Sequence, residues 1–211
     1  LVRHLDVGCG FGGLTMALAR ISPELVLALE IRPKVCEFVR QRIEALRRQT
    51  PGSYDNAGCM RHNTMLYLPN IMKKGQLDKI FFCFPDPHFK TKNHRRRIVS
   101  TALLAEYAYV LKPGGLLYAI TDVEELHKWH VNCLETHPCF DKVDVPVTDP
   151  YVAAIYDETE EGKKVKRQGG HMTDGSKYYA VYVRKQPADI DPNPPLWPEP
   201  KTPAPDAKPQ A

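Results

Sequence analysis

The 211-residue sequence contains no long hydrophobic run and carries little surplus charge. No apolar stretch approaches the roughly 18 residues of a membrane-spanning helix, so a membrane is not an expected partner. The net charge of +4 is too small to indicate a nucleic-acid binder unless the basic residues cluster. Hydrophobic residues make up 43% and charged residues 26% of the chain, values typical of a globular protein with an apolar core.

A C-x-x-C pair is also absent among the six cysteines. This spacing argues against a zinc site and against a disulfide framework. Most of the cysteines lie in apolar surroundings, so we expect reduced, buried thiols. The chain begins without methionine and enters a predicted strand at once, so we expect further native sequence upstream.

Proline is concentrated at one end, where residues 186–211 hold nine of the 19 prolines. Proline fixes φ and lacks an amide donor, so we expect this tail to be extended or disordered. We therefore divide the chain into a folded domain, 1–185, and a proline-rich tail, 186–211. A domain of about 100–200 residues is ordinary, so the first part fits a single domain.

Within 1–185, strand-like and helix-like segments alternate. Strands are predicted over 5–7, 25–31, 57–61, 78–84, 116–122, 140–146 and 178–184, and helices over 14–20, 34–49, 64–73, 94–111 and 123–136. Between 146 and 178 we expect an irregular charged segment. The alternation indicates an α/β fold with a doubly wound, mainly parallel sheet, whose ligands bind beyond the carboxyl ends of the strands.

The first two strand ends carry a nucleotide-binding pattern. Gly8, Gly10 and Gly13 in "DVGCGFGG" allow a tight turn and a close approach of the backbone to a ligand. Glu30 ends the next strand, where a carboxylate can accept both hydrogen bonds of a ribose diol, and Arg32 follows it. By itself this pattern fits a dinucleotide and S-adenosylmethionine (SAM) equally well.

Polar side chains also follow the later strands. Asn63 can read an adenine edge or cap the next helix, and the two roles are compatible. Asp86 lies between Pro85 and Pro87, which stiffen the backbone around its carboxylate. Asp122 ends the neighbouring strand. We expect the two carboxylates to hold the donor groups of a polar substrate.

A run of cations follows Asp86 without an acidic residue. It consists of Lys90, Lys92, Arg95, Arg96 and Arg97. We expect these side chains to fan across the first turns of the helix at 94–111, a helix end that favours anions. Cations at a helix end that favours anions indicate a surface to which phosphates bind. A second basic cluster comprises Lys163, Lys164, Lys166 and Arg167.

The sequence contains six motifs in this order: "DVGCGFGG", "LEIR", "FPDPHFK", "LLAEYAYVLKPGG", "ITDVEELH" and "TEEGKK". Together they resemble the motifs of the eukaryotic SAM-dependent tRNA (guanine-N7-)-methyltransferases. The resemblance covers roughly residues 5–184. It implies a seven-stranded, Rossmann-like SAM-dependent methyltransferase fold with one antiparallel strand. It also implies methyl transfer from SAM to N7 of guanine 46 in the variable loop of tRNA.

Carried over by motif, the resemblance assigns roles to single residues. It implies a cofactor pocket formed by Gly8, Gly10, Glu30, Arg32, Asn63, Thr64, Cys83, Thr159 and Glu161. It implies Asp86 as the catalytic residue, and His94, Arg97 and Asp122 as residues for substrate binding or activity. From the basic run, we add Lys90 to the substrate-binding residues. The family's basic residue before His94 is Asn93 here. The resemblance further implies a WD-repeat β-propeller partner and a location in the nucleus, with the cytoplasm as the alternative.

Two other functions remain open from the residues alone. A nicotinamide-dependent oxidoreductase would explain the glycine pattern with Glu30, although it gives Asp86 no role. A non-catalytic RNA-binding scaffold on a methyltransferase fold would explain the basic run, but predicts a degraded pocket.

Overall fold

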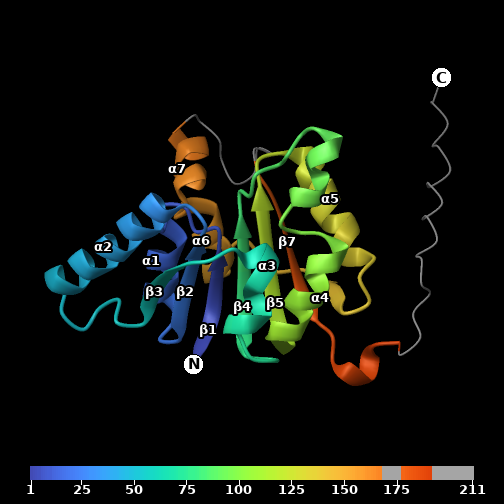
Figure 1. The fold of residues 1–211 in the computed structure, drawn as a ribbon, viewed down its shortest axis with the longest axis horizontal. Helices are drawn as coiled ribbons and strands as arrows, with labels where there is room; N and C mark the ends of the chain where they lie inside the picture. The colour runs from blue at the N-terminus through green and yellow to red at the C-terminus, as the bar shows by residue number, and fades with distance from the viewer. Residues whose placement is uncertain (168–176, 192–211) are drawn as a thin grey trace.

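A computed structural model describes residues 1–167 and 177–191 (Figure 1). The strands are β1 Val2–Val7, β2 Leu25–Glu30, β3 Ala57–Arg61, β4 Leu77–Cys83, β5 Leu111–Thr121, β6 Phe140–Val143 and β7 Tyr178–Arg184. The α-helices are α1 Gly13–Ile21, α2 Pro33–Gln49, α3 Thr64–Ile71, α4 Thr101–Val110, α5 Glu124–Glu135, α6 Pro150–Asp157 and α7 Glu160–Arg167. Short 3₁₀ helices form at η1 Thr91–Arg96 and η2 Pro187–Asp189.

The strands form one seven-stranded sheet in the order β3-β2-β1-β4-β5-β7-β6. Strands β1 to β5 pair in parallel, whereas β7 runs antiparallel to both β5 and β6. The chain order reverses beside β1, which pairs with β2 on one side and β4 on the other. Ligand clefts of open α/β sheets lie at such a reversal. The predicted fold class is therefore confirmed.

Helices cover both faces of the sheet. On one face, α1 and α6 pack on the central strands through Leu18 and Ile155, and α2 packs beside them through Val39. On the other face, α3, α4 and α5 bury residues such as Leu68 and Leu104. The parallel strands are apolar on both faces because both are covered. Among the described residues, no helix is both long and apolar enough to cross a membrane.

The prediction of a helix over 94–111 is wrong for its first residues. Residues 91–96 form the 3₁₀ helix η1, and α4 begins only at Thr101. The intervening segment is non-helical and is held by tertiary contacts: Tyr107 Oη donates to the Ile98 carbonyl (2.8 Å) and Trp129 Nε1 donates to the Val99 carbonyl (2.8 Å). These carbonyls are therefore satisfied without a helix.

The prediction of an irregular segment between 146 and 178 is also partly wrong, since α6 and α7 lie within it. Asp149 caps α6 by accepting hydrogen bonds from the amides of Tyr151 and Val152, and Pro150 occupies the first helical position. In the tail, residues 187–189 form η2. The expectation of an extended or disordered chain beyond residue 191 lies outside the described residues.

Candidate active site

A cleft of about 600 Å³ opens at the carboxyl ends of β1, β2 and β4, a size typical of cofactor sites. The lining includes all nine residues predicted for the cofactor and also Asp86: Gly8, Gly10, Glu30, Arg32, Asn63, Thr64, Cys83, Asp86, Thr159 and Glu161. These residues come from separate parts of the sequence, and the topology brings them together around one cleft.

The glycine loop, residues 8–13, forms one wall of the cleft. Gly8 and Gly10 have φ values of 70° and 54°, a conformation that side chains disfavour, and an added Cβ at either would meet no atom within 4 Å. The glycines are therefore required by the turn, and the space beside them is open to a ligand. Below the loop, Asp6 is buried and accepts a 2.6 Å hydrogen bond from Thr15 Oγ1 of α1.

Glu30 is the buried carboxylate at the end of β2, with 3% of its surface exposed. Its oxygens accept from the Gly10 amide (3.2 Å), from the Arg32 amide (2.9 Å) and from the Arg32 guanidinium (3.0–3.1 Å). Burial alone would raise the pKa of Glu30, but the hydrogen bonds from Arg32 and Gly10 outweigh burial and lower it. The carboxylate is thus held ionised and oriented beside the glycine loop, where it can accept from ribose hydroxyls.

Two helix starts close other sides of the cleft. Asn63 Oδ1 caps α3 by accepting from the Met65 amide (3.1 Å), so Asn63 performs the predicted capping role while it lines the cleft. Thr159 is buried, and its Oγ1 accepts from the Gly162 amide (2.9 Å) at the start of α7. Glu161 lies on the first turn of α7 and Thr64 begins α3.

The Pro85-Asp86-Pro87 corner follows β4 at the mouth of the cleft. The Asp86 side chain is 72% exposed, and its Oδ1 accepts from the His88 amide (3.0 Å). Phe84 and His88, on either side, have φ values of 49° and 46°, which are uncommon for non-glycine residues. Such strain persists only when surrounding contacts enforce it, and it concentrates at functional sites.

Arg97 does not lie with the other cations of the basic run. Its side chain is 2% exposed, and its guanidinium donates to the Pro87 carbonyl (2.9 Å) and to Glu125 of α5 (2.7 Å). It also lies over the Trp129 ring, 4.7 Å from the centroid. A guanidinium with these contacts supports the Asp86 corner from inside the protein.

The other predicted substrate-binding residues lie around the cleft rather than in it. Lys90 is exposed ahead of η1, and Asp122 is exposed just beyond β5. His94 is half-buried, packs edge-on against Trp129 and lies 3.9 Å from Glu125 Oε1. Arg96 is the member of the basic run that lines the cleft, and it is exposed.

Comparison with known proteins agrees with this geometry. The profile of a family described as "Putative methyltransferase" matches residues 2–174. A tRNA (guanine-N(7)-)-methyltransferase of Arabidopsis thaliana is 54% identical over 173 residues, covering 80% of this chain and 69% of the relative. The protein of the same name from Neurospora crassa is 51% identical over 203 residues, covering 94% of this chain and 65% of the relative.

The chain belongs to the tRNA (guanine-N(7)-)-methyltransferase family. It spans about two thirds of the length of these two relatives. Among solved structures, the aminoglycoside resistance methyltransferase NpmB1 shares the fold with a TM-score of 0.56 at 15% identity, covering 87% of each chain.

The residues of the cleft fit S-adenosylmethionine, the methyl donor of this family. An open glycine turn could face the amino-acid part of the cofactor, and the ionised Glu30 carboxylate would hold the ribose hydroxyls. With Oδ1 occupied in capping α3, the Asn63 amide Nδ2 would be the group available to an adenine edge. Burial raises the pKa of the Cys83 thiol well above its ordinary value, so this part of the wall is uncharged.

Several contributors to the site escaped sequence reasoning. Asp6 lies at the end of the first strand in the quoted glycine motif, so its position alone could have suggested it. Glu125 lies in the quoted motif "ITDVEELH" without a predicted role, whereas Arg42 and Trp129 lie outside the quoted motifs, and tertiary contacts connect all three with the cleft.

Proposed function

We propose that this protein transfers the methyl group of SAM to N7 of a guanine in tRNA, and that the target is guanine 46 of the variable loop. Two observations support the proposal: membership of the tRNA (guanine-N(7)-)-methyltransferase family and a cleft whose residues fit SAM. The observation that carries the chemistry is the position of Asp86, an exposed carboxylate on a rigid corner at the mouth of that cleft.

The site does not need a strong base for this reaction. Guanine N7 has an in-plane lone pair that attacks a sulfonium methyl group without prior deprotonation. The protein must instead align the base and stabilise the positive charge that develops on the purine. The Asp86 carboxylate can do both, because it can accept from the N–H groups of guanine and offset the charge.

The exposed cations beside Asp86 suit the phosphates that flank the target base. They are Lys90, Lys92, Arg95 and Arg96. Guanine N7 faces the deep groove of an RNA helix, which side chains cannot enter, so the target base must lie in a loop or be unstacked. A variable-loop guanine meets this requirement.

Transfer of labelled methyl from SAM to tRNA, with the product nucleoside identified, tests the proposal. We expect N7-methylguanosine, and a tRNA with adenine at position 46 should accept no label. Label in another nucleoside, or equal labelling of both tRNAs, would refute the proposed specificity.

The two alternatives are less well supported. If the protein were an oxidoreductase, its tryptophan fluorescence should change on titration with NADH and not with SAM. The family assignment argues against an oxidoreductase. The scaffold hypothesis predicts a degraded pocket, whereas the predicted cofactor residues all line one cleft with Asp86. That hypothesis would gain if the protein, with its partner, bound tRNA and transferred no methyl.

We also propose that the protein acts in the nucleus with a WD-repeat β-propeller subunit. The sequence resemblance supports both statements. Co-purification followed by mass spectrometry would test the partner, and fractionation of cells expressing the tagged chain would test the location.

A further inference from the structure

The junction of α6 and α7, residues 158–162, lies directly against the glycine loop. A Cβ added to Gly13 would overlap the carbonyl oxygen of Glu158 and would lie 3.2 Å from Glu160 Oε1. Because the first obstacle is backbone, it cannot swing aside as a flexible side chain can. Gly13 therefore permits this junction to dock against the start of α1.

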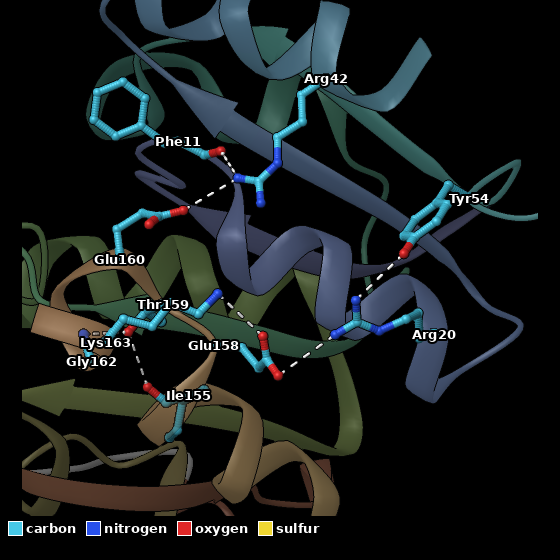
Figure 2. A network of polar contacts seen from close by, with 10 residues as sticks. All are labelled: Phe11, Arg20, Arg42, Tyr54, Ile155, Glu158, Thr159, Glu160, Gly162 and Lys163. Carbon is cyan, nitrogen blue, oxygen red and sulfur yellow. Dashed lines mark hydrogen bonds and ion pairs between the residues drawn. The ribbon is translucent and has the colours of Figure 1, made fainter. Parts of the chain in front are cut away.

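Arg42 of α2 connects the two sides of this contact. One guanidinium nitrogen donates to the Phe11 carbonyl of the glycine loop (2.7 Å) and also to Glu160 Oε1 (3.2 Å) (Figure 2). The Glu160 carboxylate lies at the N-terminal ends of both α1 and α7, where helix dipoles favour negative charge. One side chain of α2 thus joins two segments that form walls of the cleft, the glycine loop and the junction.

The same junction has a second set of charged contacts. Glu158 lies 3.7 Å from the Arg20 guanidinium of α1 and 3.3 Å from Lys163 Nζ of α7 (Figure 2). Between Glu158 and Glu160 lies Thr159, which faces the cleft and caps α7 through the Gly162 amide. The position of Thr159 in the cleft therefore depends on how the junction is docked.

We propose that Arg42 is a positioning residue for the cofactor cleft, holding residues 158–162 against the glycine loop so that Thr159 and Glu161 face the cofactor. The proposal rests on the proposed function only in taking the cleft to be a SAM site. An exposed ion pair alone would contribute little. Arg42 differs because its loss removes the bond to the Phe11 carbonyl and the bond to Glu160 together.

The test compares Arg42→Met with Arg48→Met, a matched change at an exposed arginine of the same helix. Calorimetry with S-adenosylhomocysteine should show a Kd raised about 5-fold or more for Arg42→Met and changed by less than about 2-fold for Arg48→Met. Hydrogen exchange should become faster at the amides of residues 158–164 in Arg42→Met alone. In methyl transfer, KM for SAM should rise while kcat at saturating SAM stays near the wild-type value.

Glu160→Gln and the double variant complete a cycle. If the two side chains act through one contact, the double variant should bind S-adenosylhomocysteine no more weakly than Arg42→Met. Equal Kd values for Arg42→Met and Arg48→Met, or unchanged exchange at 158–164, would overturn the proposal. Should Arg42→Met fail to fold, wild-type exchange and affinity in Glu160→Gln would overturn it.

These measurements separate the two proposals. A wild-type chain that binds S-adenosylhomocysteine but does not methylate tRNA would refute the proposed function, and the binding and exchange data would still decide the role of Arg42. A wild-type chain that does not bind S-adenosylhomocysteine would refute both.

Discussion

The Arg97 guanidinium donates a 2.9 Å hydrogen bond to the Pro87 carbonyl, one residue beyond Asp86. Glu125 and the Trp129 ring hold the same guanidinium from α5. A fully buried charge is tolerated only with such partners. Arg97 thus supports the strained corner that presents Asp86, although in the sequence it belongs to the same basic run as the exposed cations.

Asp86→Ala should remove most methyl transfer to tRNA and leave cofactor binding intact. Loss of a preorganised charge that stabilises the transition state lowers kcat by about 100-fold or more. Kd for S-adenosylhomocysteine, measured by calorimetry, should match the wild type because the cofactor residues are elsewhere in the cleft. An equal loss of cofactor affinity would contradict the catalytic assignment.

Arg96→Met and Arg97→Met should differ, although the residues are adjacent. Arg96 is exposed, so its loss should reduce the slope of log Kd for tRNA against log salt by about 0.7–0.9. Arg97 is buried, so its variant should keep the wild-type slope while kcat falls and the melting temperature drops. If Arg97→Met reduced the salt slope as Arg96→Met does, Arg97 would contact phosphate and the supporting role would be wrong.

Glu30→Ala should weaken S-adenosylhomocysteine binding by about 10-fold or more, since it removes a charged hydrogen-bond acceptor for the ribose. It also leaves the Arg32 guanidinium without this acceptor at the mouth of the cleft. Affinity for tRNA should be little changed. Glu44→Gln, at an exposed site on α2, is the control. Wild-type cofactor affinity in Glu30→Ala would place the ribose elsewhere.

Asp6 should make stability depend on pH. Burial raises the pKa of Asp6 to about 6, despite the hydrogen bond from Thr15, whereas the unfolded carboxyl titrates near 3.8. The folded state therefore binds the proton more tightly, and this stabilisation is full below pH 4 and is lost as pH rises through 6. From pH 4.5 to 7.5, the unfolding free energy of the wild type should fall relative to Asp6→Asn by about 2 kcal/mol. Denaturant titrations that show a constant difference would contradict the raised pKa.

Much of the cleft was predictable because its signals are local. The glycine turn, Glu30 at a strand end and the two prolines around Asp86 each occupy a short stretch whose structure depends on neighbouring residues. Parallel strands then bring their carboxyl ends together, so alternation of strands and helices was enough to place Gly8, Glu30 and Asp86 in one cleft.

Predictions failed where distant partners outweigh the local pattern. Residues 97–100 look helical, yet Trp129 and Tyr107 donate to the carbonyls of Val99 and Ile98 and hold the segment in a non-helical conformation. The charges of the stretch before β7 concealed α6 and α7, although Asp149-Pro150 is a helix-start signal and Val152, Ile155 and Tyr156 recur at helical spacing. These helices are stabilised by caps and by packing of α6 on α1.

By itself, the sequence determined the fold class, the glycine turn and the carboxylate corner, because each follows from residue type and order over a few positions. Only the tertiary structure decided which cation of the basic run is buried and which helix side chains hold the cleft in shape. Arg96 and Arg97 are chemically identical neighbours. Their different roles arise because α5 supplies Glu125 and Trp129 to one of them, and no local pattern encodes that contact.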